Sequence, residues 1–245
     1  MRYHNIVPGT FVRRENRFIG ICLVHGKSER VHIRNTGRCA ELFVPGASVF
    51  LQYAPSPQKK TAYTLIALYK WERLINLDSL APNKLVLEYL AQGKLLPGMA
   101  AAAEELHGEV RYGASRLDGA FTIAGQRAYL EIKGVTLERD GAAYFPDAPT
   151  ERGIRHIYEL CKARKEGFLA YLIFVIQMQG VSFFAPNYAT HPAFAQALQE
   201  AQSAGVAILA YDCQVQPECL ALGAPVPVKI EDRSSESWRQ YKWGR

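Results

Sequence analysis

The sequence predicts a mixed α/β protein in two parts: a small N-terminal β-barrel, then a larger α/β domain with a mixed central sheet. Short apolar stretches separated by Gly, Pro and Asn dominate residues 1–75, which is typical of an all-β unit. From residue 81 onward, amphipathic helical stretches alternate with apolar strands, which is typical of helices packed on a sheet. The linker NLDSLAP (76–82) sets the expected domains at 1–80 and 81–230, followed by a polar tail at 231–245.

Five strands are expected in the first domain. Two lie within residues 9–26 and separate near Glu15-Asn16, and three more are ERVHIRN, ASVFLQYA and AYTLIALYKW. The segments between them contain turn-forming Gly, Pro and Asn, for example at residues 35–37, 44–46 and 55–57. Five short strands at this spacing favour a closed barrel, and an OB-fold is the barrel that fits best.

Basic charge is concentrated in this first domain. Residues 1–80 hold 12 Lys and Arg against 5 Asp and Glu, a net charge of +7, whereas residues 81–245 hold 17 against 18. This imbalance suggests either a polyanion partner or a basic surface that only aids solubility. Because aromatic residues lie among the cations, the domain has what DNA binding needs: guanidinium groups for phosphates and rings for bases. The expected phosphate contacts here are Arg13, Arg14, Arg17, Arg34 and Arg38.

The composition argues against a membrane or secreted protein. The chain has 245 residues, of which 49% are hydrophobic and 21% charged, as in ordinary globular proteins. No apolar run is long enough to cross a membrane, and the N-terminal residues lack the apolar core of a signal peptide. The five cysteines lack the paired spacing of a zinc site and are expected to be reduced thiols. We therefore expect a cytoplasmic protein with no membrane partner.

Helices and strands alternate in the second domain. Asn83 is expected to cap the first helix, which ends at Gly93, and Thr150 to cap the second, which ends at Gly167. The segment at 169–176 has no charged residue and is expected to be a buried strand. The expected order is helix 83–92, strand 109–112, hairpin 115–134, helix 151–165, strand 169–176, helix 192–204 and strand 206–211.

The hairpin, SRLDGAFTIAGQRAYLEIKG, carries the candidate site. Glu131 and Lys133 share one face of its second strand, because side chains alternate along a strand. If Ala124 and Gly125 form a two-residue turn, Asp118 lies opposite Glu131, with their Cβ atoms about 4.5–5.5 Å apart. Two carboxylates that close repel each other unless a cation lies between them. A divalent metal and a nearby ammonium group are what phosphodiester hydrolysis needs, because they polarise the phosphate and activate water.

A structural interpretation of this hairpin is the alternative. Glu-x-Lys pairs on strands are commonly surface ion pairs that contribute little to stability. The strand LEIKG, however, is flanked by apolar residues, so we expect it in the centre of the sheet. Charged groups on a central strand need either partners or a function.

The order of helix, three-stranded meander, helix and strand resembles the core of the PD-(D/E)xK nucleases, in which Asp opens the second strand and Glu-x-Lys lies on the third. Longer strings resemble the sugar fermentation stimulation protein family, SfsA, from about residue 2 to about residue 230; they include YGASRLD (112–118), EIKGVTL (131–137) and FPDAPTERGIRHI (145–157). The resemblance implies an N-terminal OB-like domain joined to a PD-(D/E)xK nuclease-like domain, in a cytoplasmic DNA-binding protein. Many members have Phe after the aspartate, where this chain has Gly119-Ala120.

The resemblance also implies a metal site. Asp118, Glu131 and the carbonyl oxygen of Ile132 would bind Mg²⁺ or Mn²⁺, which hard oxygen ligands favour over zinc. Lys133 would position the attacking water or stabilise charge on the phosphate, so Asp118, Glu131 and Lys133 form the catalytic set. Glu88 on the first helix is a further candidate metal ligand.

Two functions stay open. One is a metal-dependent DNA nuclease, and the other is a DNA-binding regulatory protein, linked to sugar metabolism by the family name, whose nuclease-like core is not catalytic. Arg152, Arg155 and His156 near the start of the second helix are candidate phosphate contacts, with packing or surface salt bridges as the alternative. The sequence also leaves open whether two chains pair as a homodimer to cut both strands.

Overall fold

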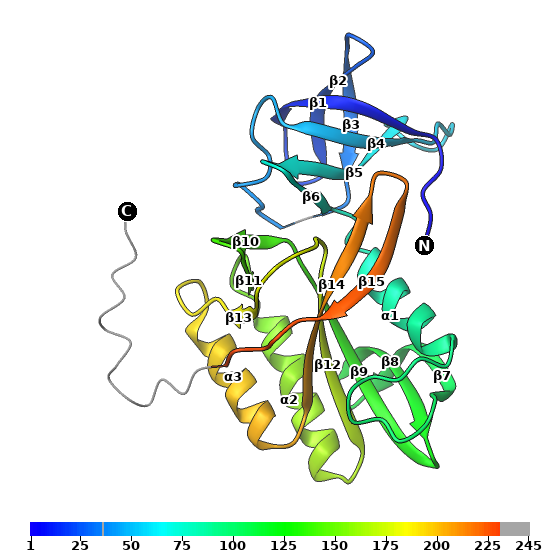
Figure 1. The fold of residues 1–245 in the computed structure, drawn as a ribbon, viewed down its shortest axis with the longest axis vertical. Helices are drawn as coiled ribbons and strands as arrows, with labels where there is room; N and C mark the ends of the chain where they lie inside the picture. Colours follow the sequence, from blue (N-terminus) through cyan, green and yellow to red (C-terminus); the bar gives the residue numbers. More distant parts are fainter. Residues whose placement is uncertain (36, 231–245) are drawn as a thin grey trace.

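A computed structural model describes residues 1–35 and 37–230, and these form two bodies stacked along the long axis (Figure 1). The upper body is the barrel, and the lower body is a sheet with helices on both faces. No helix in the described ranges is both long enough and apolar enough to span a membrane. The expected tail at 231–245 lies outside the described residues.

The barrel closes as expected. Its sheet has the order β3-β2-β1-β4-β5-β6, and an additional parallel pairing of β3 with β5 joins the ends of the first five strands. Phe11, Val31 and Leu65 fill its interior. The predicted five-stranded barrel is therefore confirmed, while β6 extends from β5 outside the closure. The strands are β1 (Ile6–Arg14), β2 (Ile19–Val24), β3 (Lys27–Ile33), β4 (Ser48–Tyr53), β5 (Tyr63–Lys70) and β6 (Arg73–Asn76).

The lower body is built on a six-stranded mixed sheet with the order β15-β14-β12-β9-β8-β7. Strands β7, β8 and β9 form an antiparallel meander, β9, β12 and β14 are parallel, and β15 is antiparallel to β14. The predicted mixed sheet and the central position of the second hairpin strand, β9, are both confirmed. The strands are β7 (Glu104–Tyr112), β8 (Ser115–Ile123), β9 (Gln126–Val135), β12 (Leu169–Ile176), β14 (Ala207–Gln216) and β15 (Cys219–Pro225).

Helices cover both faces of this sheet (Figure 1). Helix α1 (Ala81–Ala91) packs Leu85 and Val86 against Leu130 and Ile132 of β9. Helices α2 (Glu151–Lys165) and α3 (Pro192–Ser203) cover the opposite face, where their apolar side chains join those of β12. Strand β9 therefore carries apolar side chains toward α1 and presents Glu131 toward α2.

Several boundaries differ from the sequence-based expectation. Helix α1 begins at Ala81 with Leu80 as its N-cap, because Pro82 suits the first helical turn, where no backbone donor is required. Asn83 is consequently not a cap. Strand β7 begins at Glu104 rather than Glu109. Glu105 and Glu109 have positive φ, which interrupts the regular alternation of side chains without ending the strand.

The sequence-based expectation also missed short strands. A three-stranded sheet joins β10 (Leu137–Arg139), β11 (Ala142–Phe145) and β13 (Phe184–Pro186). Strand β15 was missed as well, because its stability comes from pairing with β14 and its sequence has no strong alternation.

Candidate metal and phosphodiester site

The register of the β8–β9 hairpin is the predicted one. Ala124 and Gly125 form the turn with φ of 46° and 81°, and Ile123 pairs with Gln126. Positive φ at both central residues matches a turn that suits the twist of a hairpin. The ladder continues to Gly119 opposite Leu130. The ladder ends there, so the predicted pairing of Asp118 with Glu131 lies one residue beyond it, although the charge of Glu131 acts on Asp118.

The Asp118 carboxylate accepts two hydrogen bonds. Its Oδ2 accepts from the backbone N–H of Ile132 at 2.8 Å, and its Oδ1 accepts from Nδ2 of Asn83 at 2.8 Å. Burial and the negative charge of Glu131 nevertheless raise the pKa of Asp118 above its ordinary value. Two hydrogen bonds therefore fix the orientation of the Asp118 carboxylate, but the described side chains do not fully compensate its negative charge.

Glu131 is almost completely buried, with 1% of its surface exposed. Its Oε1 accepts from Nδ1 of His156 at 2.6 Å and from Nζ of Lys133. Burial alone would raise the pKa of Glu131, but the His156 hydrogen bond and the Lys133 ammonium outweigh burial, so its pKa is lowered. Its second oxygen, Oε2, is buried and has no hydrogen-bond partner among the described residues.

His156 belongs to the site through Glu131. Its Nε2 lies 3.4 Å from Nε of Arg152, which can only donate, so Nε2 accepts and Nδ1 carries the proton that Glu131 receives. His156 is itself buried on α2. Sequence reasoning considered His156 only as a phosphate contact, because the 25-residue separation from Glu131 gives no local signal. Asn83 was similarly taken as a helix cap and missed as a partner of Asp118.

The residues present fit a hard divalent cation. Asp118 and Glu131 supply oxygen donors on adjacent strands, and the unpartnered Oε2 of Glu131 is a buried acceptor without a donor. Among the described residues, no group of three or more His, Cys, Asp and Glu side chains could hold a metal. A site with two carboxylates therefore suits Mg²⁺, which usually keeps several waters and uses one or two protein carboxylates, better than zinc. The predicted contribution of the Ile132 carbonyl oxygen stays a prediction.

A groove of about 650 Å³ opens beside Asp118, between α1 and β7. Glu88 lines this groove together with Asp118 and Asn83. Its carboxylate is 40% exposed and lies 3.5 Å from the amino nitrogen of Met1 and 3.7 Å from Nζ of Lys84. Glu88 is therefore on the rim of the site, and its predicted role as a metal ligand stays a prediction.

Arg14 has a different role from the predicted one. Its guanidinium stacks on the ring of Phe43 at 4.5 Å, and its N–H groups donate to five backbone carbonyls. We therefore reassign Arg14 from phosphate binding to holding two loops together, because its donors are already used within the barrel. The five acceptors are the carbonyl oxygens of Asn16, Arg17, Asn35, Gly37 and Arg38.

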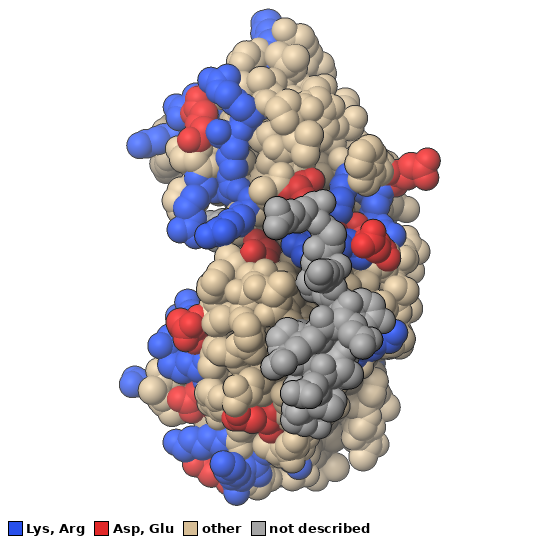
Figure 2. Space-filling view, turned by 90° about the vertical axis from the view of Figure 1, so that its left-hand side faces the viewer, with Lys and Arg blue, Asp and Glu red and all other residues tan. Residues whose placement is uncertain are grey.

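The other predicted phosphate-binding arginines lie at the surface or near it. Arg13 is 62% exposed beside Glu15, and Arg34 forms an ion pair with Asp78 at 2.8 Å. Arg17 and Arg38 are exposed on the barrel, as are Arg152 and Arg155 on α2. Figure 2 shows Lys and Arg gathered on one side of the barrel, at the edge of the hollow between the two bodies.

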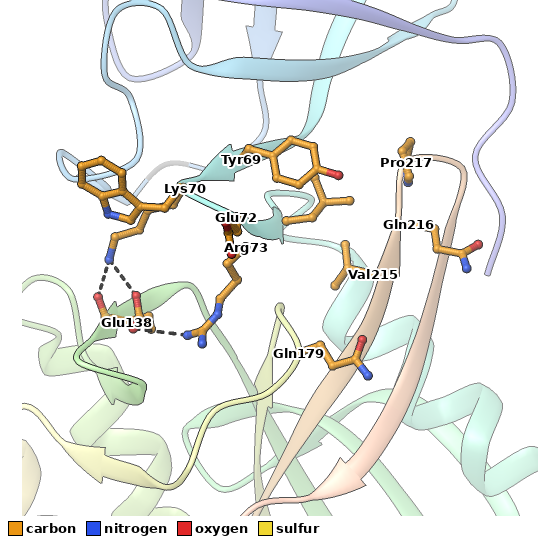
Figure 3. Close-up of a pocket in the computed structure, with 11 residues that line it drawn as sticks. Tyr69, Lys70, Glu72, Arg73, Glu138, Gln179, Val215, Gln216 and Pro217 are labelled. Atoms are coloured by element: carbon orange, nitrogen blue, oxygen red, sulfur yellow. Dashed lines mark hydrogen bonds and ion pairs between the residues drawn. The ribbon is translucent and has the colours of Figure 1, made fainter.

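A larger hollow of about 880 Å³ lies elsewhere, between the β5–β6 turn and the β14–β15 turn. Its lining includes none of the predicted site residues. Figure 3 shows Lys70 and Arg73 of the barrel reaching toward Glu138 of the lower body. The distances are 2.8 Å from Lys70 Nζ and 3.2 Å from Arg73 Nη1 to the two carboxylate oxygens. These cations are thus used in joining the two bodies.

Two family models match the chain. One, described as Sugar fermentation stimulation protein RE domain, matches residues 80–219, and the other, described as SfsA N-terminal OB domain, matches residues 12–77. A sugar fermentation stimulation protein homolog from Ruminiclostridium cellulolyticum is 45% identical over 230 residues, which cover 94% of this chain and 100% of the relative. A homolog from Desulfitobacterium hafniense strain Y51 is 44% identical over 230 residues, with coverage of 94% and 99%.

A solved structure is also similar. The structure of Pyrococcus furiosus SfsA in complex with Ca²⁺ superposes with a TM-score of 0.83 at 31% identity, covering 94% of this chain and 98% of that one. The similarity therefore extends over both bodies rather than one. The chain belongs to the SfsA family, the sugar fermentation stimulation proteins.

Proposed function

We propose that this protein is a DNA-binding phosphodiesterase whose metal site is formed by Asp118 and Glu131, with Lys133 beside them. The observation that carries the proposal is the buried, unpartnered Oε2 of Glu131 next to a second carboxylate whose pKa is raised. Two neighbouring buried carboxylates destabilise a fold, because each buried charge needs a counter-charge. The related Pyrococcus furiosus SfsA structure is a complex with Ca²⁺, and this supports the proposal of a hard-cation site in the present chain.

The residues divide the chemistry between them. When bound, Mg²⁺ or Mn²⁺ would supply Lewis acidity to the phosphate and lower the pKa of a water. Asn83 and the Ile132 N–H hold Asp118, and His156 holds Glu131, so that both carboxylates face the reaction with fixed geometry. Lys133 places an ammonium where negative charge grows as the water oxygen bonds to phosphorus and the ester P–O bond breaks. The water loses one proton, and the leaving oxygen gains one.

DNA is the proposed substrate because of the charge distribution. The net charge of +7 lies in residues 1–80, and exposed arginines lie on both bodies. A phosphodiester polymer is the substrate that such a surface and a two-carboxylate site have in common. The alternative, a regulatory DNA-binding protein with a non-catalytic core, is favoured by one observation: Glu131 Oε1 is already occupied by both Lys133 and His156.

Asp118→Ala tests the proposal. We expect purified protein with Mg²⁺ or Mn²⁺ to cleave DNA, EDTA to stop cleavage, and Asp118→Ala to lower the rate at least a hundredfold, because a metal ligand is lost. DNA affinity, measured by fluorescence anisotropy in EDTA, should be nearly unchanged. Single-stranded, duplex, flapped and branched DNA should all be assayed by gel.

Asp140→Ala is the matched control, since Asp140 is an exposed aspartate in the β10–β11 turn. It should cleave like the wild type. Cleavage that survives in Asp118→Ala would indicate a contaminant or another site, and no cleavage of any substrate by the wild type would favour the regulatory alternative.

A further inference from the structure

One loop of the barrel contacts segments that adjoin three elements of the candidate site. The described residues 34–35 and 37–39, which follow β3 and which we name the bridging loop, contact the lower body at three points. Nη1 of Arg34 pairs with Asp78 at 2.8 Å, just before α1, and the carbonyl oxygen of Arg34 accepts from Oγ of Ser79 at 3.0 Å. The other two contacts, from Arg38 and Cys39, reach the segment before α2 and the end of β9.

These contacts fix the bridging loop against the segment before α2 and the end of β9. The backbone N–H of Arg38 donates to Oδ2 of Asp147 at 3.0 Å, four residues before α2, and Sγ of Cys39 lies 3.7 Å from Oγ1 of Thr136, directly after β9. Helix α1 carries Asn83, α2 carries His156, and β9 carries Glu131 and Lys133. The loop therefore contacts segments next to three of the four elements that build the site; the fourth, β8, carries Asp118.

The bridging loop is also held rigidly. Arg14 donates to the carbonyl oxygens of Asn35, Gly37 and Arg38, so the Arg38 backbone is bonded through both its N–H and its C=O. Gly37 lies against the Asp147 carboxylate, and a Cβ there would lie 2.5 Å from Oδ2 of Asp147, so a side chain at this position would displace that carboxylate. A loop held at this many points presents its side chains in a fixed position, which lowers the entropy lost on binding.

Three exposed arginines, one on the bridging loop and two on α2, lack a carboxylate partner among the described residues. Within the described ranges, Arg38, Arg152 and Arg155 are exposed and form no ion pair with Asp or Glu. Arg38 is on the bridging loop, and Arg152 and Arg155 are on the first turns of α2, which Asp147 precedes. Guanidinium groups without a carboxylate partner create a field that attracts a polyanion.

We propose that the bridging loop is one wall of the DNA-binding surface at the metal site, and that Asp147 is the positioning residue that holds Arg38 in line with Arg152 and Arg155. The barrel and α2 would then contact phosphates of the same DNA molecule. The proposal rests on the proposed function only for its partner, DNA, and does not require cleavage. Asp147 is itself negatively charged, but it strengthens DNA binding because its carboxylate holds the backbone of Arg38 in place.

The direction in which Asp147 substitutions change DNA affinity distinguishes a positioning role from a purely electrostatic effect of the Asp147 charge. If Asp147 acted only as a charge near DNA, both Asp147→Ala and Asp147→Asn would bind DNA more tightly, because each removes a negative charge. If it positions Arg38, Asp147→Ala weakens binding, whereas Asp147→Asn keeps a side-chain oxygen for the Arg38 N–H and binds at least as tightly as the wild type.

The experiment measures affinity for a fluorescent DNA by anisotropy in EDTA, at several salt concentrations. Arg38→Gln should reduce the slope of log K against log salt by about 0.9 on duplex or about 0.7 on single strands, as expected for one lost phosphate contact. Asp147→Ala should give a similar reduction, and the double variant should be no weaker than either single variant. Gly37→Ala, which displaces the Asp147 carboxylate, should behave like Asp147→Ala.

Arg111→Gln is the matched control, since Arg111 is an exposed arginine on the edge strand β7, and it should leave the slope unchanged. Melting temperatures and Mn²⁺ titrations should show that all variants are folded with an intact metal site. Tighter binding by Asp147→Ala, or additive losses in the double variant, would overturn the inference alone. Absence of DNA binding in the wild type would overturn it together with the proposed DNA partner, whereas absence of cleavage would affect only the proposed reaction.

Discussion

At the residue scale, Asp118 and Glu131 have opposite electrostatic environments although they are neighbours. Glu131 accepts a hydrogen bond from His156 and lies beside the Lys133 ammonium, so its pKa is lowered despite burial. Asp118 receives two hydrogen bonds, but burial and the charge of Glu131 raise its pKa. The metal-free protein therefore has one carboxylate that stabilises the fold at neutral pH and one that destabilises it, and a bound cation would relieve the second.

Asp118→Asn should stabilise the metal-free protein. An asparagine can keep both contacts, accepting from the Ile132 N–H and donating to the Asn83 amide after that amide turns over, while the unfavourable charge is lost. If the gain is about 1 kcal/mol, the Tm in EDTA at neutral pH should rise by about 2–4 °C. The Tm increase that Mn²⁺ gives the wild type should be absent in the variant, which calorimetry can measure.

The pH dependence of this difference follows from the direction of the shift. A raised folded pKa means that the penalty is present above that pKa and disappears as the pH falls toward the ordinary aspartate value of about 3.9. The Tm difference between Asp118→Asn and the wild type should therefore shrink as the pH falls. Glu131 works in the opposite sense, because its stabilisation is lost as the pH falls through its lowered pKa. A Tm difference that grows toward low pH would contradict the assignment.

At the scale of single elements, α2 is the support of the site. Thr150 caps it, with Oγ1 accepting from the N–H of Gly153 at 3.1 Å, and its first turns carry Arg152, Arg155 and His156. The cap was predictable because Thr before an amphipathic stretch is a strong helix-start signal. The contact of His156 with Glu131 was not, because it depends on how α2 lies across β9.

Thr150→Ala should lower the free energy of unfolding by about 1 kcal/mol, the usual cost of losing a side-chain cap. For a chain of this size the Tm should fall by about 2–4 °C. Thr150→Ser, which keeps the hydroxyl oxygen, should stay close to the wild type. Equal losses in both variants would show that the threonine methyl group, and not the cap, stabilises the start of α2.

At the scale of the whole molecule, the two bodies are joined by polar contacts at several points. Nε2 of Gln177 donates at 3.0 Å both to Oδ1 of Asn76 and to the carbonyl oxygen of Asp78, and all three residues are buried. Glu138 binds Lys70 and Arg73 on another side of the junction. A junction satisfied in this way holds the barrel in one orientation, so charges on the barrel keep a constant position relative to the metal site.

Arginines on the barrel should therefore contribute to DNA affinity in a salt-dependent way. Replacing Arg13 and Arg17 with Gln should flatten the slope of log K against log salt by up to about 2 units on duplex DNA, if each holds one phosphate. Arg139→Gln, an exposed arginine of β10, serves as the control. Mn²⁺ affinity should not change, because the metal ligands lie in the other body. An unchanged slope in the double variant would mean that this face of the barrel only aids solubility.

Arg14→Gln should behave differently from these variants. Because Arg14 holds five carbonyls of two loops, its loss should lower the Tm as well as the DNA affinity. The sequence could not separate Arg14 from its neighbours, since a guanidinium bonded to carbonyls and one facing solvent look alike in a basic stretch.

The sequence by itself determined what local rules control. Alternating apolar residues and turn residues predicted the barrel strands and the β8–β9 register, which pairs Ile123 with Gln126 and continues to Gly119 opposite Leu130. Strand periodicity and backbone φ preferences act over a few residues, so they can be read without knowing the rest of the chain.

Tertiary structure alone decided how distant segments meet. Asn83 reaches Asp118 across 35 residues, His156 reaches Glu131 across 25, and Arg38 reaches Asp147 across 109. Short strands such as those of the β10-β11-β13 sheet exist for the same reason, because they are stabilised by partners and not by their own propensity. Contacts of this kind arise when helices, strands and the two bodies pack against one another, and no local pattern in the chain specifies which side chains that packing will bring within hydrogen-bonding distance.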